Sequence, residues 1–112
     1  MEYIELINAL SDEIQYAEEN FIPIIRKESA KYLYDFVRQR GFSNVLEVGT
    51  AIGFSGSIIL AAGAKRLTTI DINEKSLVVA KTTFEKLGYI GNVTIYHNDA
   101  KVVLQNLVND II

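Results

Sequence analysis

The sequence predicts an α/β fold in which helices alternate with the strands of a small parallel sheet. From residue 45 onward, short apolar runs alternate with segments whose apolar residues recur at helical spacing. Glycines mark several of the places where one kind of segment gives way to the other. Strands joined through helices lie parallel, with right-handed connections. We therefore expect two leading helices, a helical cap over residues 1–41, followed by a βαβαβα core over residues 42–112.

The composition indicates a single domain with a substantial core. The chain has 112 residues, of which 49% are hydrophobic and 22% charged, with a formal net charge of −3. A chain of this size buries roughly two-thirds of its unfolded surface, and its hydrophobicity excludes intrinsic disorder. No apolar run reaches the roughly 20 residues of a membrane span, and no basic leader opens the chain. We expect a cytoplasmic protein that contacts neither membrane nor DNA, because its mild acidity does not favour binding to nucleic acid.

The reactive residue types are few. There is no cysteine, which excludes disulfides, thiolate metal sites and a cysteine nucleophile. There is one histidine, His97, so a single copy cannot form a site with several histidine ligands. We interpret His97 as an exposed residue at a strand edge, since no partner for general base catalysis can be identified near it in the sequence. The sequence therefore predicts no catalytic residue and no metal ligand.

The cap consists of two helical patterns separated by Pro23. The residue before a proline is pushed out of the α region, so the first helix must end before this point. The second helix is expected to end at Gly41, a suitable residue for a left-handed C-terminal position. The apolar residues at helical spacing are Ile4, Ile7, Leu10, Ile14 and Ala17 in the first pattern, and Ala30, Leu33, Tyr34 and Val37 in the second.

The core is expected to contain three strands, over residues 45–48, 67–72 and 93–97. A helix over residues 55–62 follows the first strand, and Asn73 is placed to cap the next helix. A last helix carries Val103, Leu104, Leu107 and Val108 on one side. Parallel sheets normally have more strands and two covered faces. We therefore expect a truncated domain, or one completed by a partner chain, a homodimer or a swapped oligomer.

The turn after the first strand carries the most informative residues. Gly49 and Gly53 stand where a strand gives way to a helix, and a helix N-terminus attracts anionic groups. Ala51 replaces the middle glycine of the dinucleotide fingerprint, which weakens a pyrophosphate interpretation. A wider turn preceded by an acid suits a zwitterion: Glu47 can meet an ammonium group, and Ser55 a carboxylate. This combination indicates the amino-acid end of S-adenosylmethionine.

The next two strand ends supply the contacts for a nucleoside. Asp71 follows Gly49 by roughly 20 residues, the spacing of an acid that accepts hydrogen bonds from ribose hydroxyls. Ile72 would lie against adenine, Asp99 would accept from its amino group, and the Ala100 N–H would donate to a ring nitrogen. Each residue has a simpler interpretation as part of a turn, a helix cap or a loop. Their joint placement at three strand ends favours a nucleoside ligand.

These motifs resemble those of the S-adenosylmethionine-dependent O-methyltransferases of the catechol and caffeoyl-coenzyme A type. Residues 45–55 are similar to the family's first motif, residues 69–73 to its ribose motif and residues 98–100 to its adenine motif. Residues 17–25 are similar to the entrance segment of bacterial members that methylate 5-hydroxyuridine in tRNA. The resemblance implies a Rossmann-like methyltransferase fold and cofactor contacts from Thr50.

The resemblance places Ile24 or Ile25 near the methionine part of the cofactor.

The resemblance also implies which parts of the family's domain are absent from this sequence. The family's catalytic Mg²⁺ is bound by an Asp on the next strand and by a later Asp-Asn pair, and neither occurs in this sequence. We therefore expect a partial domain, residues 1–112, that binds S-adenosylmethionine or S-adenosylhomocysteine with little turnover. The family implies a small hydroxylated molecule or a tRNA as methyl acceptor.

Three alternatives remain open at this point. The chain could be an active methyltransferase whose remaining strands come from another chain. It could be a non-enzymatic interaction module whose open sheet edge is a pairing surface. It could also be a nucleotide-phosphate-binding half-domain completed by a partner chain.

Overall fold

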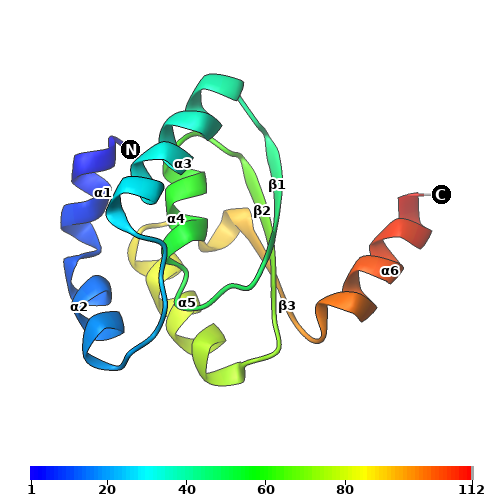
Figure 1. The fold of residues 1–112 in the computed structure, drawn as a ribbon. Coiled ribbons are helices and arrows are strands. Elements are labelled where there is room, and N and C mark those ends of the chain that lie inside the picture. Colours follow the sequence, from blue (N-terminus) through cyan, green and yellow to red (C-terminus); the bar gives the residue numbers. More distant parts are fainter. Residues whose placement is uncertain (112) are drawn as a thin grey trace.

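A computed structural model describes residues 1–111 and shows helices alternating with a three-stranded parallel sheet (Figure 1). The strand order is β1-β2-β3, and both pairs of neighbours are parallel, as expected for strands joined through helices. The fold class predicted from the sequence is confirmed, whereas the division at residues 41 and 42 stays a prediction. In chain order the elements are α1 (Tyr3–Ala9), α2 (Ser11–Glu19), α3 (Lys27–Arg40), β1 (Asn44–Val48), α4 (Phe54–Ala61), β2 (Arg66–Asp71), α5 (Glu74–Lys86), the 3-10 turn η1 (Ile90–Asn92), β3 (Val93–His97) and α6 (Ala100–Ile111).

The first helical pattern of the sequence forms two helices rather than one. Leu10 stands between α1 and α2 with ψ of 14°, which turns the chain although no glycine or proline marks the place. The Leu10 side chain is fully buried, as is that of Leu6 one turn earlier. Burial of both leucines therefore accompanies the break. Helix α3 ends as predicted, with Gly41 in the left-handed conformation at φ 65°.

The core lies between the sheet and helices α1 to α5. Leu67 and Thr69 of β2 point to this side, and Leu67 packs with Phe84 of α5 around Gly56. Because side chains alternate along a strand, Ile70 points to the other side of the sheet, the side on which α6 extends away (Figure 1). The sheet thus has one face covered by five helices and one face with α6 alone among the described elements. No helix within residues 1–111 is long and apolar enough to cross a membrane.

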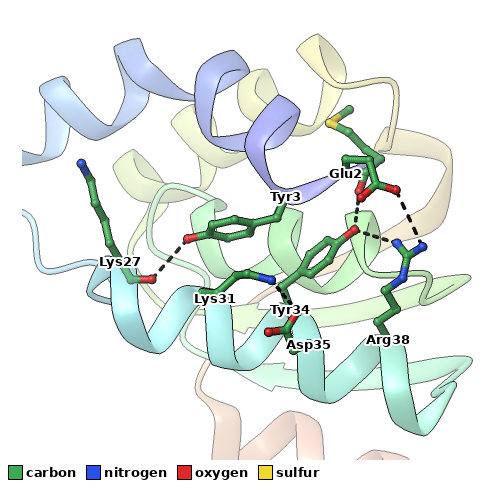
Figure 2. Close-up of polar contacts among 8 residues, drawn as sticks. Glu2, Tyr3, Lys27, Lys31, Tyr34, Asp35 and Arg38 are labelled. Carbon is green, nitrogen blue, oxygen red and sulfur yellow. Dashed lines mark hydrogen bonds and ion pairs between the residues drawn. The ribbon is translucent and has the colours of Figure 1, made fainter.

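The N-terminus is fixed to α3 by a pair of tyrosines (Figure 2). The Tyr34 hydroxyl donates to the carbonyl of Met1 at 2.8 Å and accepts from Arg38 Nη1 at 2.8 Å. The Tyr3 hydroxyl donates to the carbonyl of Lys27 at 3.2 Å, and the Tyr3 and Tyr34 rings lie 5.5 Å apart. These contacts hold the N-terminal end of the chain and α1 against α3.

Candidate functional site

The backbone between β1 and α4 forms the glycine turn that the sequence predicts. Gly49 and Gly53 have φ of 92° and 85°, a region that side chains with a Cβ atom avoid. A Cβ at Gly53 would also lie 3.3 Å from the Cα of Ala80, so glycine is needed there for space as well. Ala51 adopts φ of 49°, a left-handed conformation that costs roughly 1–2 kcal/mol for an L-residue. The turn therefore contains a strained residue that other contacts must stabilise.

Asp71, the last residue of β2, supplies those contacts. Its Oδ2 accepts from the N–H of Thr50 at 2.9 Å and from the N–H of Ala51 at 3.0 Å. Its Oδ1 accepts from the N–H of Asn73 at 2.9 Å. A carboxylate has about four acceptor positions, so these bonds leave one position for a ligand hydroxyl. Asp71 thus ties the glycine turn to the loop that leads into α5.

Glu47 is the acid of β1 that the sequence places before the turn, and it lies partly buried behind this turn. Its carboxylate accepts from the hydroxyl of Ser55 through Oε2 and from Thr69 Oγ1 through Oε1 at 2.8 Å. The Thr69 and Thr50 hydroxyls lie 2.7 Å apart. Since the single proton of Thr69 is donated to Glu47, Thr50 must donate to Thr69. The result is a chain of three hydrogen bonds that links four side chains, from α4 (Ser55) through β1 (Glu47) and β2 (Thr69) to the turn (Thr50).

The protonation of Glu47 responds to opposing effects. Burial raises the pKa of its carboxyl above the ordinary value of 4.5, the hydrogen bonds from Ser55 and Thr69 lower it, and the charge of Asp71 raises it. Burial has the largest effect, so the pKa of the Glu47 carboxyl is raised. Because Ser55 donates its proton to Glu47, its hydroxyl can only accept from a ligand. A ligand carboxylate would therefore have to bind backbone N–H groups of the first turn of α4, which precedes the first helical bond from Ser57 to Gly53.

An open cavity of about 280 Å³ lies at the carboxyl ends of the three strands. It contains two carboxylates, a glycine of the turn and the exposed apolar side chain of Ile72, so it offers both polar and apolar contacts. All three strand ends contribute to it. The lining residues are Val48, Gly49, Ile70, Asp71, Ile72, Asn98, Asp99 and Ala100.

The end of β3 is tied to the loop after β2. The N–H of Asn98 donates to the carbonyl of Asp71 at 3.1 Å, and His97 Nε2 lies 3.1 Å from the carbonyl of Ile72. Asp99 Oδ1 accepts from the N–H of Lys101 at 2.8 Å, so one oxygen of Asp99 helps to start α6. The two strand ends therefore hold each other in place across the cavity.

The predicted site residues divide into three groups. Five of them line the cavity: Gly49, Asp71, Ile72, Asp99 and Ala100. Four more lie behind it in the turn and the hydrogen-bond network: Glu47, Thr50, Gly53 and Ser55. Ile24 packs against the core from the segment between α2 and α3 and does not line the cavity.

Sequence reasoning missed some residues of the site. Thr69 completes the acceptor set of Glu47, and the two residues are register partners on neighbouring strands. The available signal in the sequence was a threonine within the second predicted strand, the neighbour of the strand that carries Glu47. Val48 and Ile70 also line the cavity, although as apolar strand residues they carried no signal for a ligand. Among the residues that the structure describes, no three His, Asp or Glu side chains are gathered as a metal site would need.

A family model described as O-methyltransferase matches residues 4–112. The chain belongs to the O-methyltransferase family. A protein-L-isoaspartate O-methyltransferase of Pyrobaculum islandicum is 33% identical over 73 residues, which are 63% of this chain and 35% of that protein. The resemblance seen in the motifs is thus confirmed at the level of the family.

Solved structures of O-methyltransferases share the fold. The O-methyltransferase of Bacillus cereus in complex with SAH has a TM-score of 0.81 and 24% identity, covering 91% of this chain and 48% of that one. TomG of Streptomyces achromogenes in complex with SAM has a TM-score of 0.79 and 26% identity, covering 88% and 46%. A candidate caffeoyl-CoA O-methyltransferase of Staphylococcus aureus has a TM-score of 0.74 and 26% identity, covering 89% and 46%. The chain spans about half the length of these structures and about a third of the Pyrobaculum protein.

Proposed function

We propose that this chain binds S-adenosylmethionine, or its product S-adenosylhomocysteine, as the cofactor-holding part of an O-methyltransferase. The observation that carries the proposal is the cavity at the strand ends, where Asp71 and Asp99 converge beside Ile72. One ribose hydroxyl would donate to the remaining acceptor position of Asp71. Adenine would lie against Ile72, with its amino group toward Asp99 and a ring nitrogen toward the Ala100 N–H.

The methionine end of the cofactor would extend over the glycine turn. The cavity is slightly smaller than the roughly 300–1,000 Å³ of typical ligand sites, so it would hold the adenosine part. In this proposal Gly53 and Thr50 give the turn its shape, and the charge of Glu47 favours an ammonium group near it. Ile24 would contact the methionine part only after the segment between α2 and α3 moves from its place on the core.

The chemistry of the family is an in-line displacement. The acceptor oxygen attacks the methyl carbon, the carbon–sulfur bond breaks, and its electron pair returns to sulfur to leave a neutral thioether. A divalent metal would lower the pKa of the acceptor hydroxyl, but the described residues do not assemble ligands for it. We therefore propose that this chain positions the methyl donor and gives little turnover alone. Membership of the family supports a small hydroxylated molecule as the acceptor, and the likeness of residues 17–25 supports a tRNA hydroxyuridine instead.

Calorimetry with S-adenosylhomocysteine tests the proposal. We expect saturable binding, and stabilisation against unfolding of about 2.7 kcal/mol at a ligand concentration of 100 times Kd. Ile72→Glu should abolish binding without loss of stability, because this side chain is 69% exposed and lines the cavity. Val78→Glu is the matched control, since Val78 is 61% exposed on α5 and outside the cavity. Absence of binding to the wild type, or equal binding by both variants, would refute the proposed site.

A second candidate function is that of an interaction module. It is favoured by the exposed apolar residues along β1, at the edge of the sheet. A third candidate function is the binding of a nucleotide phosphate. Binding of NAD to the cavity, with no binding of S-adenosylhomocysteine, would support it.

A further inference from the structure

We propose that His97 is a positioning residue for the nucleoside base. Its imidazole fixes the peptide between Ile72 and Asn73, and through this peptide it fixes the Ile72 side chain against which adenine would lie. His97 does not line the cavity, so it would act through Ile72 rather than touch the ligand. This inference rests on the proposed function, because it assigns a residue to the adenine contact of that same site.

The backbone pairing between β2 and β3 ends one residue before Ile72. Asp71 and His97 are the last register partners of the two strands. Beyond them the N–H of Asn98 donates to the Asp71 carbonyl at 3.1 Å. Among residues 1–111, no backbone N–H donates to the Ile72 carbonyl. The position of the peptide that follows Ile72 therefore depends on side chains.

The His97 ring supplies a donor for this carbonyl. Its Nε2 atom lies 3.1 Å from the Ile72 carbonyl oxygen. Because a carbonyl oxygen can only accept, Nε2 must carry the hydrogen of this bond, and Nδ1 is the unprotonated nitrogen of the neutral ring. A side chain of β3 thus continues the pairing of the two strands one residue past the point where their backbones stop pairing.

A second side chain holds the N–H of the same peptide. The N–H of Asn73 donates to Asp71 Oδ1 at 2.9 Å. The C=O and N–H groups of a trans peptide point in opposite directions, so rotation of this peptide would break both bonds. Asn73 is fixed on its other side as well, because its side chain caps α5 by accepting from the N–H of Ser76 at 3.1 Å. His97 is therefore one of two side chains that hold the peptide.

The orientation of this peptide matters because Ile72 lines the cavity with an exposed side chain. A side chain that is not enclosed by its neighbours takes its direction mainly from its backbone and the rotamers which that backbone allows. A base that binds against a surface already in place does not have to supply the free energy of ordering it. The bond from His97 would therefore strengthen binding of the base without contacting it.

Calorimetry with S-adenosylhomocysteine tests the proposal with three variants. His97→Val removes the donor and keeps a residue suited to a strand. We expect it to bind roughly 2–10-fold more weakly, which corresponds to the loss of one hydrogen bond. His97→Gln retains an N–H donor at the end of a side chain of similar reach and should restore wild-type affinity.

Thr94→Val is the matched control for these variants, because Thr94 lies on the same strand and outside the cavity. It should bind as the wild type does. Unchanged affinity in His97→Val, or no restoration by His97→Gln, overturns the proposal.

A double-mutant cycle shows whether His97 acts through Ile72. In a chain that carries Ile72→Ala the apolar contact with the base is removed, so adding His97→Val should change the affinity by less than about twofold. A contact of His97 that only stabilises the strand end would give the same loss in both backgrounds, because independent effects add. Equal losses in the two backgrounds therefore overturn the proposal.

Amide hydrogen exchange examines the contact without any ligand. We expect the N–H of Asn73 to exchange faster in His97→Val than in the wild type, and at the wild-type rate in His97→Gln, because the peptide loses one of its two supports. Unchanged exchange at Asn73 overturns the proposal even where S-adenosylhomocysteine binds. Faster exchange in a protein whose wild type does not bind S-adenosylhomocysteine overturns the proposed function, and the role of His97 in base binding with it.

Discussion

Glu47 and Asp71 are two carboxylates with different partners in the same hydrogen-bonded region. Glu47 accepts from the hydroxyls of Ser55 and Thr69, whereas Asp71 accepts only from backbone N–H groups. The sequence correctly indicated that both acids stand at strand ends. It could not indicate which donors reach each oxygen, because that depends on the register of β1 with β2 and on the path of the turn.

Glu47→Gln tests the effect of pH at this residue. The folded-state pKa of Glu47 is raised above 4.5 chiefly by burial, so the folded chain holds its proton more tightly than the unfolded chain. Its contribution to stability is therefore fully present below pH 4.5 and is lost as pH rises through the raised value. We expect the melting temperature of the wild type to fall relative to Glu47→Gln as pH is raised above 4.5. A constant difference between the two proteins would contradict this.

Asp71→Asn tests the role of the second carboxylate. An amide offers one oxygen where the carboxylate uses two, so it cannot accept from Thr50, Ala51 and Asn73 together. We expect a loss of about 1.5–3 kcal/mol of stability, the range for hydrogen bonds to charged groups, and at least tenfold weaker binding of S-adenosylhomocysteine. Urea unfolding and calorimetry measure the two effects. Asp12→Asn on α2 is the control that should change neither.

At the scale of elements, most helices and strands could be predicted because their apolar periodicity agrees with their burial. Asn73 caps α5 as predicted, its side chain accepting from the N–H of Ser76 at 3.1 Å. The break at Leu10 could not be predicted, since it carries no glycine or proline. Val108, assigned to the apolar side of the last helix, lies where the structure describes no side chains.

Gly56 tests how closely α4 packs on the sheet. A Cβ there would lie 2.7 Å from Leu67 Cδ2 and 3.1 Å from Phe84 Cζ, so α4 or its neighbours must move. We expect Gly56→Ala to destabilise the fold by roughly 1–3 kcal/mol, as overpacking does, despite the helix propensity of alanine. Gly91→Ala is the control, because a Cβ there meets nothing within 4 Å. Equal stability of the two variants in thermal unfolding would contradict close packing at Gly56.

At the scale of the whole molecule, parallel strands bring residues far apart in the sequence to one end of the sheet. This rule predicted that Glu47, Asp71 and Asp99 lie around one cavity; Asp71 and Asp99 line the cavity, whereas Glu47 does not. It did not place Glu47 behind the turn or Ile24 on the core, because those positions depend on tertiary packing. The small sheet was also predicted, and the chain spans about half of the structures that it matches.

The first residue of the chain is part of the packed structure. The amino group of Met1 donates to the carbonyl of Ala61 at 3.3 Å, while its own carbonyl accepts from Tyr34. An affinity tag fused ahead of Met1 would convert this ammonium group into an uncharged amide and add chain where α1, α3 and α4 meet. Protein for calorimetry is therefore better purified with a removable tag, so that the contacts of Met1 with Ala61 and Tyr34 are kept.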